Sequence, residues 1–137
     1  MSARSKARKR AVDILYSADI RGSSMNEALA DAAGRAATEP QRQASWVYAR
    51  DIVTGVTEHG DEIDELIATY AQGWTIERMP AVDRAVVRIG IWELLFNDEV
   101  PDSVAIAEAV GLASELSTDD SGKFVNGLLG RIALTKA

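Results

Sequence analysis

The chain has 137 residues, of which 47% are hydrophobic and 26% are charged, and its formal net charge is −6. This length and composition are typical of one globular domain with a single core, and they exclude a disordered chain. The absence of cysteine excludes a disulfide framework, a thiol nucleophile and a cysteine-ligated metal site.

The single histidine, His59, lies between Glu58 and Gly60 at an expected helix end. We therefore expect an exposed cap residue rather than a metal ligand or a catalytic triad member. Asp13 and Asp19 interrupt the segment after the basic N-terminus, and no apolar run is long enough for a membrane to accept. We expect a cytoplasmic protein without a metal, a cofactor or a membrane span.

Positive charge is concentrated at the N-terminus. Five of the fifteen basic residues lie among the first ten positions, without any acid: Arg4, Lys6, Arg8, Lys9 and Arg10. We call these five residues the basic arm. The rest of the chain carries ten basic residues against 21 acids. A polyanion is therefore expected to bind chiefly to the basic arm, and the acidic remainder suits a basic protein partner. A solvated face of mixed charge is the alternative interpretation.

Apolar residues recur at helical spacing along most of the chain, so we predict an all-α fold. The basic arm begins the first helix or leads straight into it, and Gly22 lies just beyond the end of that helix. Ser24 and Glu27 fit a capping box that opens a short helix through about Ala33, and Gly34 is expected to end it.

Two further helices are expected over residues 38–58 and 61–71. The predicted core residues of the longer one are Trp46, Val47, Ala49 or the stem of Arg50, Val53 and Val56. Residues 82–96 differ because ten of the fifteen are apolar, so other helices must surround this segment. Gly90 in its middle indicates the close approach of a neighbouring helix. A sixth helix through Leu116 and a seventh opened by residues 117–120 complete one domain, residues 1–137.

The last helix carries Lys123, Phe124 and Asn126 beside its apolar stripe, and Tyr16 stands at the edge of the first helix. Single-stranded RNA is bound by such a set, because rings stack on bases, amides bond base edges and cations hold phosphates. If the first and last helices lie side by side, both rings and the basic arm form one platform. A core position for Phe124 is the alternative.

Four stretches match a known family pattern. They are Ala11, Leu15 and Tyr16; Asp83, Arg84, Ala85, Val87, Arg88, Glu93 and Leu94; Pro101, Val104, Ile106, Glu108, Ala109 and Val110; and Lys123, Phe124, Val125, Asn126 and Gly127. In this order and spacing the chain resembles the NusB family of transcription antitermination factors over nearly its whole length. The resemblance implies an all-α fold of two small packed bundles and a protein that is not an enzyme.

The resemblance also implies partners: the single-stranded boxA element of nascent ribosomal RNA, the ribosomal protein NusE, and the RNA polymerase antitermination complex. The residues it implies for RNA are Arg4, Lys6, Arg8, Lys9, Tyr16, Asp120, Lys123, Phe124 and Asn126. For NusE it implies Glu77 and Asp83, whereas Arg84 and Arg88 either join that surface or pair with helix acids.

The chain departs from the family pattern at Ala107, Gly130 and Trp92, where an asparagine, an acid and a tyrosine are common. Two other functions remain open. One is a helical interaction or homodimerisation module without an RNA role. The other is the helical domain of rRNA cytosine methyltransferases, which the lack of a cofactor-binding α/β domain after residue 137 disfavours.

Overall fold

The structure, a computed structural model, describes residues 2–39 and 43–136. Every regular element in these two ranges is a helix. The α-helices are α1 (Ala3–Arg21), α2 (Met25–Thr38), α3 (Gln43–Glu58), α4 (Gly60–Tyr70), α5 (Ala81–Phe96), α6 (Asp102–Leu116) and α7 (Asp119–Ala133), and a short 3-10 helix, η2 (Ile76–Arg78), precedes α5. The predicted all-α fold of about seven helices is confirmed. None of the described helices is long and apolar enough to cross a membrane.

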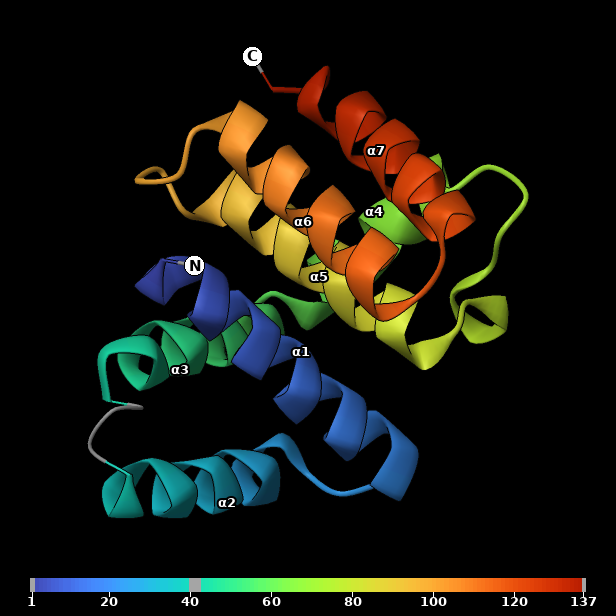
Figure 1. The fold of residues 1–137 in the computed structure, drawn as a ribbon. Coiled ribbons are helices and arrows are strands. Elements are labelled where there is room, and N and C mark those ends of the chain that lie inside the picture. Colours follow the sequence, from blue (N-terminus) through green and yellow to red (C-terminus); the bar gives the residue numbers. More distant parts are fainter. Residues whose placement is uncertain (1, 40–42, 137) are drawn as a thin grey trace.

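The helices form two bundles that share α5 (Figure 1). Helices α1, α2 and α3 pack on one another in the first bundle, and α4, α6 and α7 surround α5 in the second. Helix α5 also packs against α1 and α3, so ten of its sixteen residues are buried and none is fully exposed. This position explains why residues 82–96 carry no broad polar face.

The middle of α5 confirms the close approach that Gly90 predicts. A Cβ atom at this position would lie 2.7 Å from Cδ1 of Leu129 on α7 and 3.2 Å from Cβ of Ala109 on α6. Because real Cβ atoms essentially never approach another heavy atom that closely, only glycine fits without a shift of the neighbours. Helices α5, α6 and α7 therefore meet at Gly90.

Two predicted features of the first bundle are wrong. Helix α2 does not end at Gly34 but continues to Thr38, because Ala36 is buried and extends the packing of α2 by one more turn. Thr38 therefore belongs to α2 and does not cap the next helix, and Pro40, which we expected in the first turn of that helix, lies outside the described residues. Val47 on α3 is 48% exposed, and Ile52 is fully buried in its place.

The basic arm forms the first turns of α1. The Ser2 hydroxyl caps this helix by accepting a hydrogen bond of 3.1 Å from the backbone N–H of Ser5. Helical spacing then distributes the basic residues of the arm over different faces of α1. One face is buried against α3 and α5, and the other is exposed.

Candidate nucleic-acid interface

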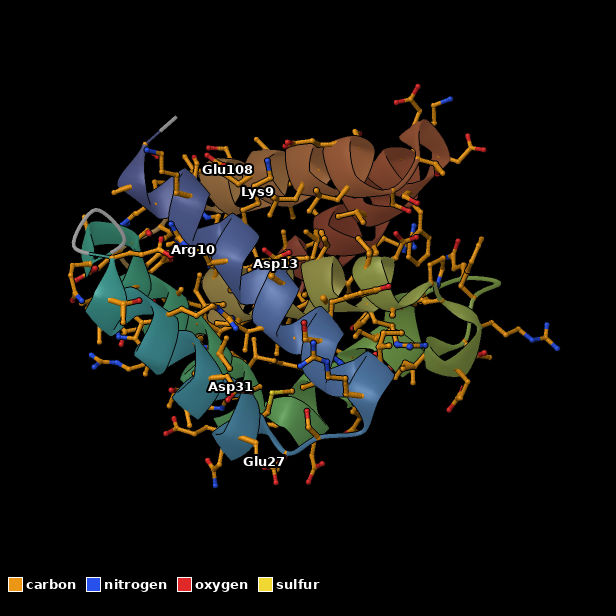
Figure 2. All side chains as sticks on the ribbon, turned by 60° about the horizontal axis from the view of Figure 1, so that its bottom comes forward. Lys9, Arg10, Asp13, Glu27, Asp31 and Glu108 are labelled. Atoms are coloured by element: carbon orange, nitrogen blue, oxygen red, sulfur yellow. The ribbon has the colours of Figure 1, made fainter. Side chains whose placement is uncertain are left out.

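The exposed face of α1 holds a basic groove. Lys6, Lys9, Arg10 and Asp13 line this depression of about 260 Å³, and Figure 2 shows Lys9, Arg10 and Asp13 following one another along the helix. The ammonium group of Lys6 has no partner among the described residues. Tyr16 is 39% exposed and lies at helical spacing from Lys9 and Asp13, on the same face. We refer to this depression as the α1 groove.

Two cations of the basic arm form exposed ion pairs. Arg4 binds Glu99 with an N–O distance of 3.1 Å, and Lys9 binds Glu115 at the end of α6 at 2.5 Å. Exposed pairs of this kind contribute only about 0 to 1 kcal/mol. A phosphate group can therefore replace either carboxylate at little cost.

Arg8 requires a correction, because we expected it to contact RNA phosphates. Its side chain is 3% exposed, and its Nε donates to both oxygens of the buried Glu93 on α5, at 2.8 and 3.0 Å. Glu108 on α6 lies 3.4 Å from the same guanidinium. Arg8 therefore holds α1 against the second bundle and is not available to a phosphate in this conformation.

Tyr48 on α3 completes the polar cluster around Arg8. Its hydroxyl donates to Glu93 and accepts a hydrogen bond of 3.0 Å from the Nδ2 amide of Asn97. Burial raises the pKa of Tyr48 well above its ordinary value, and the hydrogen bond to Glu93 raises it further. The hydroxyl thus stays protonated and serves as a donor. We call these four residues, Arg8, Tyr48, Glu93 and Asn97, the buried polar cluster.

The N-terminal half of α7 carries the second candidate surface. Phe124 is half-buried, and its ring centroid lies 5.6 Å from that of Trp74, which is 45% exposed in the loop before η2. Both rings and Asp120 line a depression of about 380 Å³. Lys123 and Asn126 are exposed nearby on α7. The sequence reasoning missed Trp74, although a tryptophan between Gly73 and a threonine in a loop is itself a signal of an exposed ring.

The structure does not bring the two rings onto one platform. Helix α7 packs against α6, α5 and α4, whereas α1 packs against α3, α5 and α2. In Figure 1 helices α5 and α6 lie between α1 and α7. The condition for a joint platform of Tyr16, Phe124 and the basic arm is therefore not met, and the α1 groove and the α7 surface are separate.

The four residues expected at a protein partner differ in their exposure. Glu77 is exposed on η2. Asp83 is only 3% exposed: its Oδ2 accepts a hydrogen bond of 2.8 Å from Ser121, and its Oδ1 has no hydrogen-bond partner among the described residues. Asp83 thus lies inside the protein rather than on a partner-facing surface.

The two arginines beside Asp83 pair with helix acids. Arg84 binds Asp19 on α1 at 2.9 Å and also donates to two backbone carbonyls. Arg88 binds Asp64 on α4 through two hydrogen bonds of 2.9 and 3.1 Å. Their contacts match the structural alternative, in which each arginine joins two helices.

The described ranges contain no cluster of acidic or histidine side chains that could hold a metal ion. His59 is the residue before α4, and its ring stacks on Phe96 with the centroids 3.8 Å apart. Its side chain is 33% exposed. His59 therefore lies at a helix end, as predicted, but is partly covered by the Phe96 ring.

Comparison with known proteins assigns the family. A family model described as the NusB family matches residues 5–134. The transcription antitermination protein NusB of Leifsonia xyli subsp. xyli is 68% identical to 99% of this chain, which covers 94% of that protein. The corresponding protein of Clavibacter sepedonicus is 66% identical, and all of both chains are covered.

Solved structures share the fold. T. maritima NusB has a TM-score of 0.85 and 32% identity, with 98% of this chain and 92% of that chain covered. A chain from a crystal structure of the antitermination factors NusB and NusE in complex with dsRNA has a TM-score of 0.85 and 28% identity over 99% of both chains. Since the family match spans α1 through α7, this chain belongs to the NusB family, whose members are transcription antitermination factors and not enzymes.

Proposed function

We propose that this chain binds the boxA element of nascent ribosomal RNA together with the ribosomal protein NusE, and that the assembly joins RNA polymerase to suppress premature termination. The observation that carries this proposal is the α1 groove. Three cations converge there on a chain whose net charge is −6, and Lys6 has no partner among the described residues. Phosphates of a single strand complete this arrangement.

A solved relative supports both partners. The structure that matches with a TM-score of 0.85 holds NusB and NusE with double-stranded RNA. In the present chain Arg4, Lys6, Lys9 and Arg10 supply phosphate contacts, and Tyr16 on the same face supplies a ring for one base. On α7, Asp120, Lys123, Phe124 and Asn126 form a second RNA contact, and Arg8 keeps α1 in place.

A titration of labelled RNA tests the RNA half of the proposal. BoxA RNA and a scrambled RNA of equal length are titrated with the chain alone and with NusE added. We expect boxA to bind more tightly, and the Lys6→Gln, Lys9→Gln double variant to lower the slope of log affinity against log salt by about 0.7 per lost contact. The matched control is Arg50→Gln, Arg78→Gln, which removes the same charge from exposed positions outside the α1 groove. Equal slopes in both double variants would contradict the role of the groove.

The NusE half rests on Glu77 and the neighbouring loop. Glu77 is exposed without a partner among the described residues, whereas Asp83 is buried, so substitution of Asp83 would disturb the fold as well as an interface. We expect Glu77→Lys to weaken binding of NusE several-fold through charge reversal and to leave RNA binding by the chain alone unchanged. Surface plasmon resonance with immobilised NusE measures this difference, and an unchanged NusE affinity would exclude η2 from the interface.

Self-association is the remaining prediction about partners. Sedimentation of the chain alone and with boxA RNA distinguishes a monomer that binds RNA from a homodimer that forms without it.

A further inference from the structure

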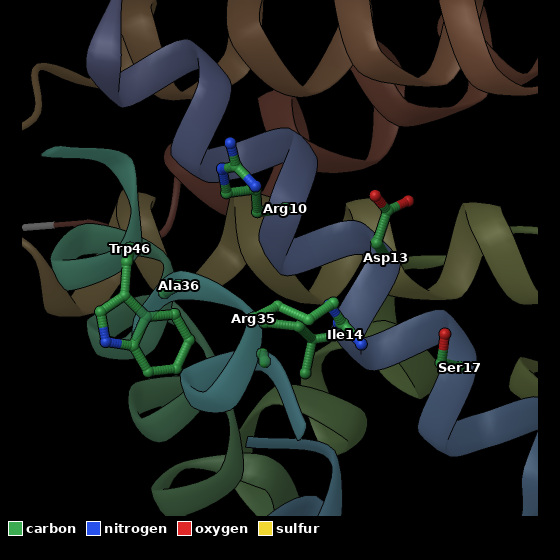
Figure 3. A pocket seen from close by; sticks show the side chains of 8 residues that line it. Arg10, Asp13, Ile14, Ser17, Arg35, Ala36 and Trp46 are labelled. Carbon is green, nitrogen blue, oxygen red and sulfur yellow. The ribbon is translucent and has the colours of Figure 1, made fainter. Parts of the chain in front are cut away.

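A second, larger cavity adjoins the α1 groove. It has a volume of about 370 Å³ and lies between α1, α2 and α3 (Figure 3). Its lining comprises Arg10, Asp13, Ile14 and Ser17 of α1, Ala32, Arg35 and Ala36 of α2, and Trp46 of α3. This volume lies within the range of pockets that bind small molecules, about 300 to 1,000 Å³.

The polar groups at this cavity are largely without partners among the described residues. Arg10 donates its Nε to Ser45 at 2.6 Å, which leaves both terminal guanidinium nitrogens for a ligand. Arg35 is exposed and forms no ion pair within the described ranges, although Asp13 also lines the cavity. Two arginines and one aspartate therefore line the cavity, and the excess charge is positive.

An aromatic surface lies at one side of the same cavity. Trp46 is half-buried, and Figure 3 shows its indole ring on the side opposite Asp13, with Arg10 and Arg35 between them. A tryptophan ring stacks on any nucleobase, and such stacking contributes about 1 to 3 kcal/mol per base. Guanidinium groups beside a stacking ring match the phosphate and base of one nucleotide.

The cavity and the α1 groove are adjacent depressions that share two lining residues. Arg10 and Asp13 line both depressions, so a strand that follows Lys6 and Lys9 along the groove arrives at the cavity mouth. This adjacency favours an RNA strand over a small anion, because Lys6 and Lys9 in the α1 groove can bind the phosphates that precede the nucleotide in the cavity.

We propose that this cavity binds one nucleotide of the RNA strand held in the α1 groove, with the base stacked on Trp46 and the phosphate bound by Arg10 and Arg35. This inference rests on the proposed RNA-binding function and extends the RNA path onto α2 and α3, away from the α7 surface. Ser17 offers a hydroxyl for the ribose or base, and Asp13 disfavours a second phosphate inside the cavity.

Arg35→Gln tests the proposal, because Arg35 is exposed and its side chain forms no hydrogen bond or ion pair within the described residues. The probe is fluorescein-labelled single-stranded boxA RNA, measured by anisotropy over a range of salt. We expect Arg35→Gln to weaken binding several-fold and to lower the salt slope by about 0.7, as for the loss of one phosphate contact on a single strand. Arg78→Gln, the same change at an exposed arginine on η2, should leave affinity and slope near the wild-type values.

Tryptophan fluorescence tests the stacking half on the same samples. RNA should quench the emission of the wild-type chain, and Trp46→Phe should reduce this quenching, the remainder coming from Trp74 beside Phe124. Equal affinities of Arg35→Gln and Arg78→Gln, or equal quenching with and without Trp46, would overturn the assignment of the cavity while the proposed function stands. Absence of RNA binding by the wild type, with or without NusE, would overturn both.

Discussion

At the scale of single residues, the buried polar cluster is the feature that decides how α1 is held. Arg8 and Glu93 are 3% and 1% exposed, and they connect α1 to α5 across the boundary between the bundles. Removing one partner of a buried pair leaves an uncompensated charge and typically costs about 3 to 5 kcal/mol. The orientation of the α1 groove therefore depends on residues that cannot themselves contact RNA.

Tyr48 gives this cluster a measurable pH dependence. The unfolded chain ionises Tyr48 near its ordinary pKa of 10.0, whereas burial and Glu93 keep it protonated in the folded state. The folded state then binds more protons above pH 10, so the free energy of unfolding falls as pH rises through this range, and the contribution is fully present below it. We expect Tyr48→Phe to flatten this alkaline decline. Urea unfolding at pH 8 to 11 measures the free energy of unfolding of the wild type and of Tyr48→Phe. Parallel declines in the two proteins would contradict the assignment of the pH dependence to Tyr48.

At the scale of helices, two glycines show separately how tight packing and helix propensity affect stability. Gly90 is crowded by Leu129 and Ala109, whereas Gly34, inside the exposed part of α2, would meet nothing within 4 Å. We expect Gly90→Ala to destabilise the protein by about 1 to 3 kcal/mol through overpacking. Gly34→Ala should stabilise it by about 0.5 to 1 kcal/mol, because alanine is the better helix former. Thermal unfolding of both variants checks the opposite signs, and the same sign in both would contradict this account.

These helices also show what the sequence could and could not predict. Apolar spacing predicted each of the seven α-helices and the central place of α5, since those signals are local. The same spacing places Arg8 with Ala11 and Leu15 on the apolar face of α1, so its burial was within reach. Its partner Glu93 lies 85 residues away, and no local pattern indicates that contact. The extension of α2 past Gly34 likewise depends on tertiary packing, which overrides propensity.

At the scale of the whole molecule, the acidic body competes with RNA for its own cations. Glu99 and Glu115 pair with Arg4 and Lys9 at the exposed start of α1. We expect Glu99→Gln, Glu115→Gln to tighten RNA binding several-fold, because phosphates no longer displace carboxylates. The control, Glu58→Gln, Glu65→Gln, removes equal charge from exposed acids outside these pairs. Anisotropy titration at low salt measures the RNA affinity of both double variants. An equal gain in affinity in the two would show that net charge alone explains the effect.

The candidate site was harder to predict than the fold at this scale. The three cations of the α1 groove followed from charge segregation in the first ten positions, which is a sequence property, whereas the place of Asp13 beside them did not. The separation of Tyr16 from Phe124 did not, because it depends on α5 and α6 lying between the first and last helices. The cavity beside Trp46 is formed by three helices, so no single segment of the sequence predicts it. For the same reason the sequence does not predict that Arg10 and Arg35 line the same cavity.

Helix α2 is attached more weakly than the others, and this has a consequence for dynamics. Its buried residues are three alanines, Ala28, Ala32 and Ala36, and it packs against α1 and α3 but not appreciably against α5. Small side chains bury little apolar area, so α2 should open in sub-global fluctuations well before the shared helix α5 does. Backbone amides of α2 are therefore expected to exchange with deuterium ahead of those in α5, and an occupied cavity should slow that exchange by joining α2 to its neighbours.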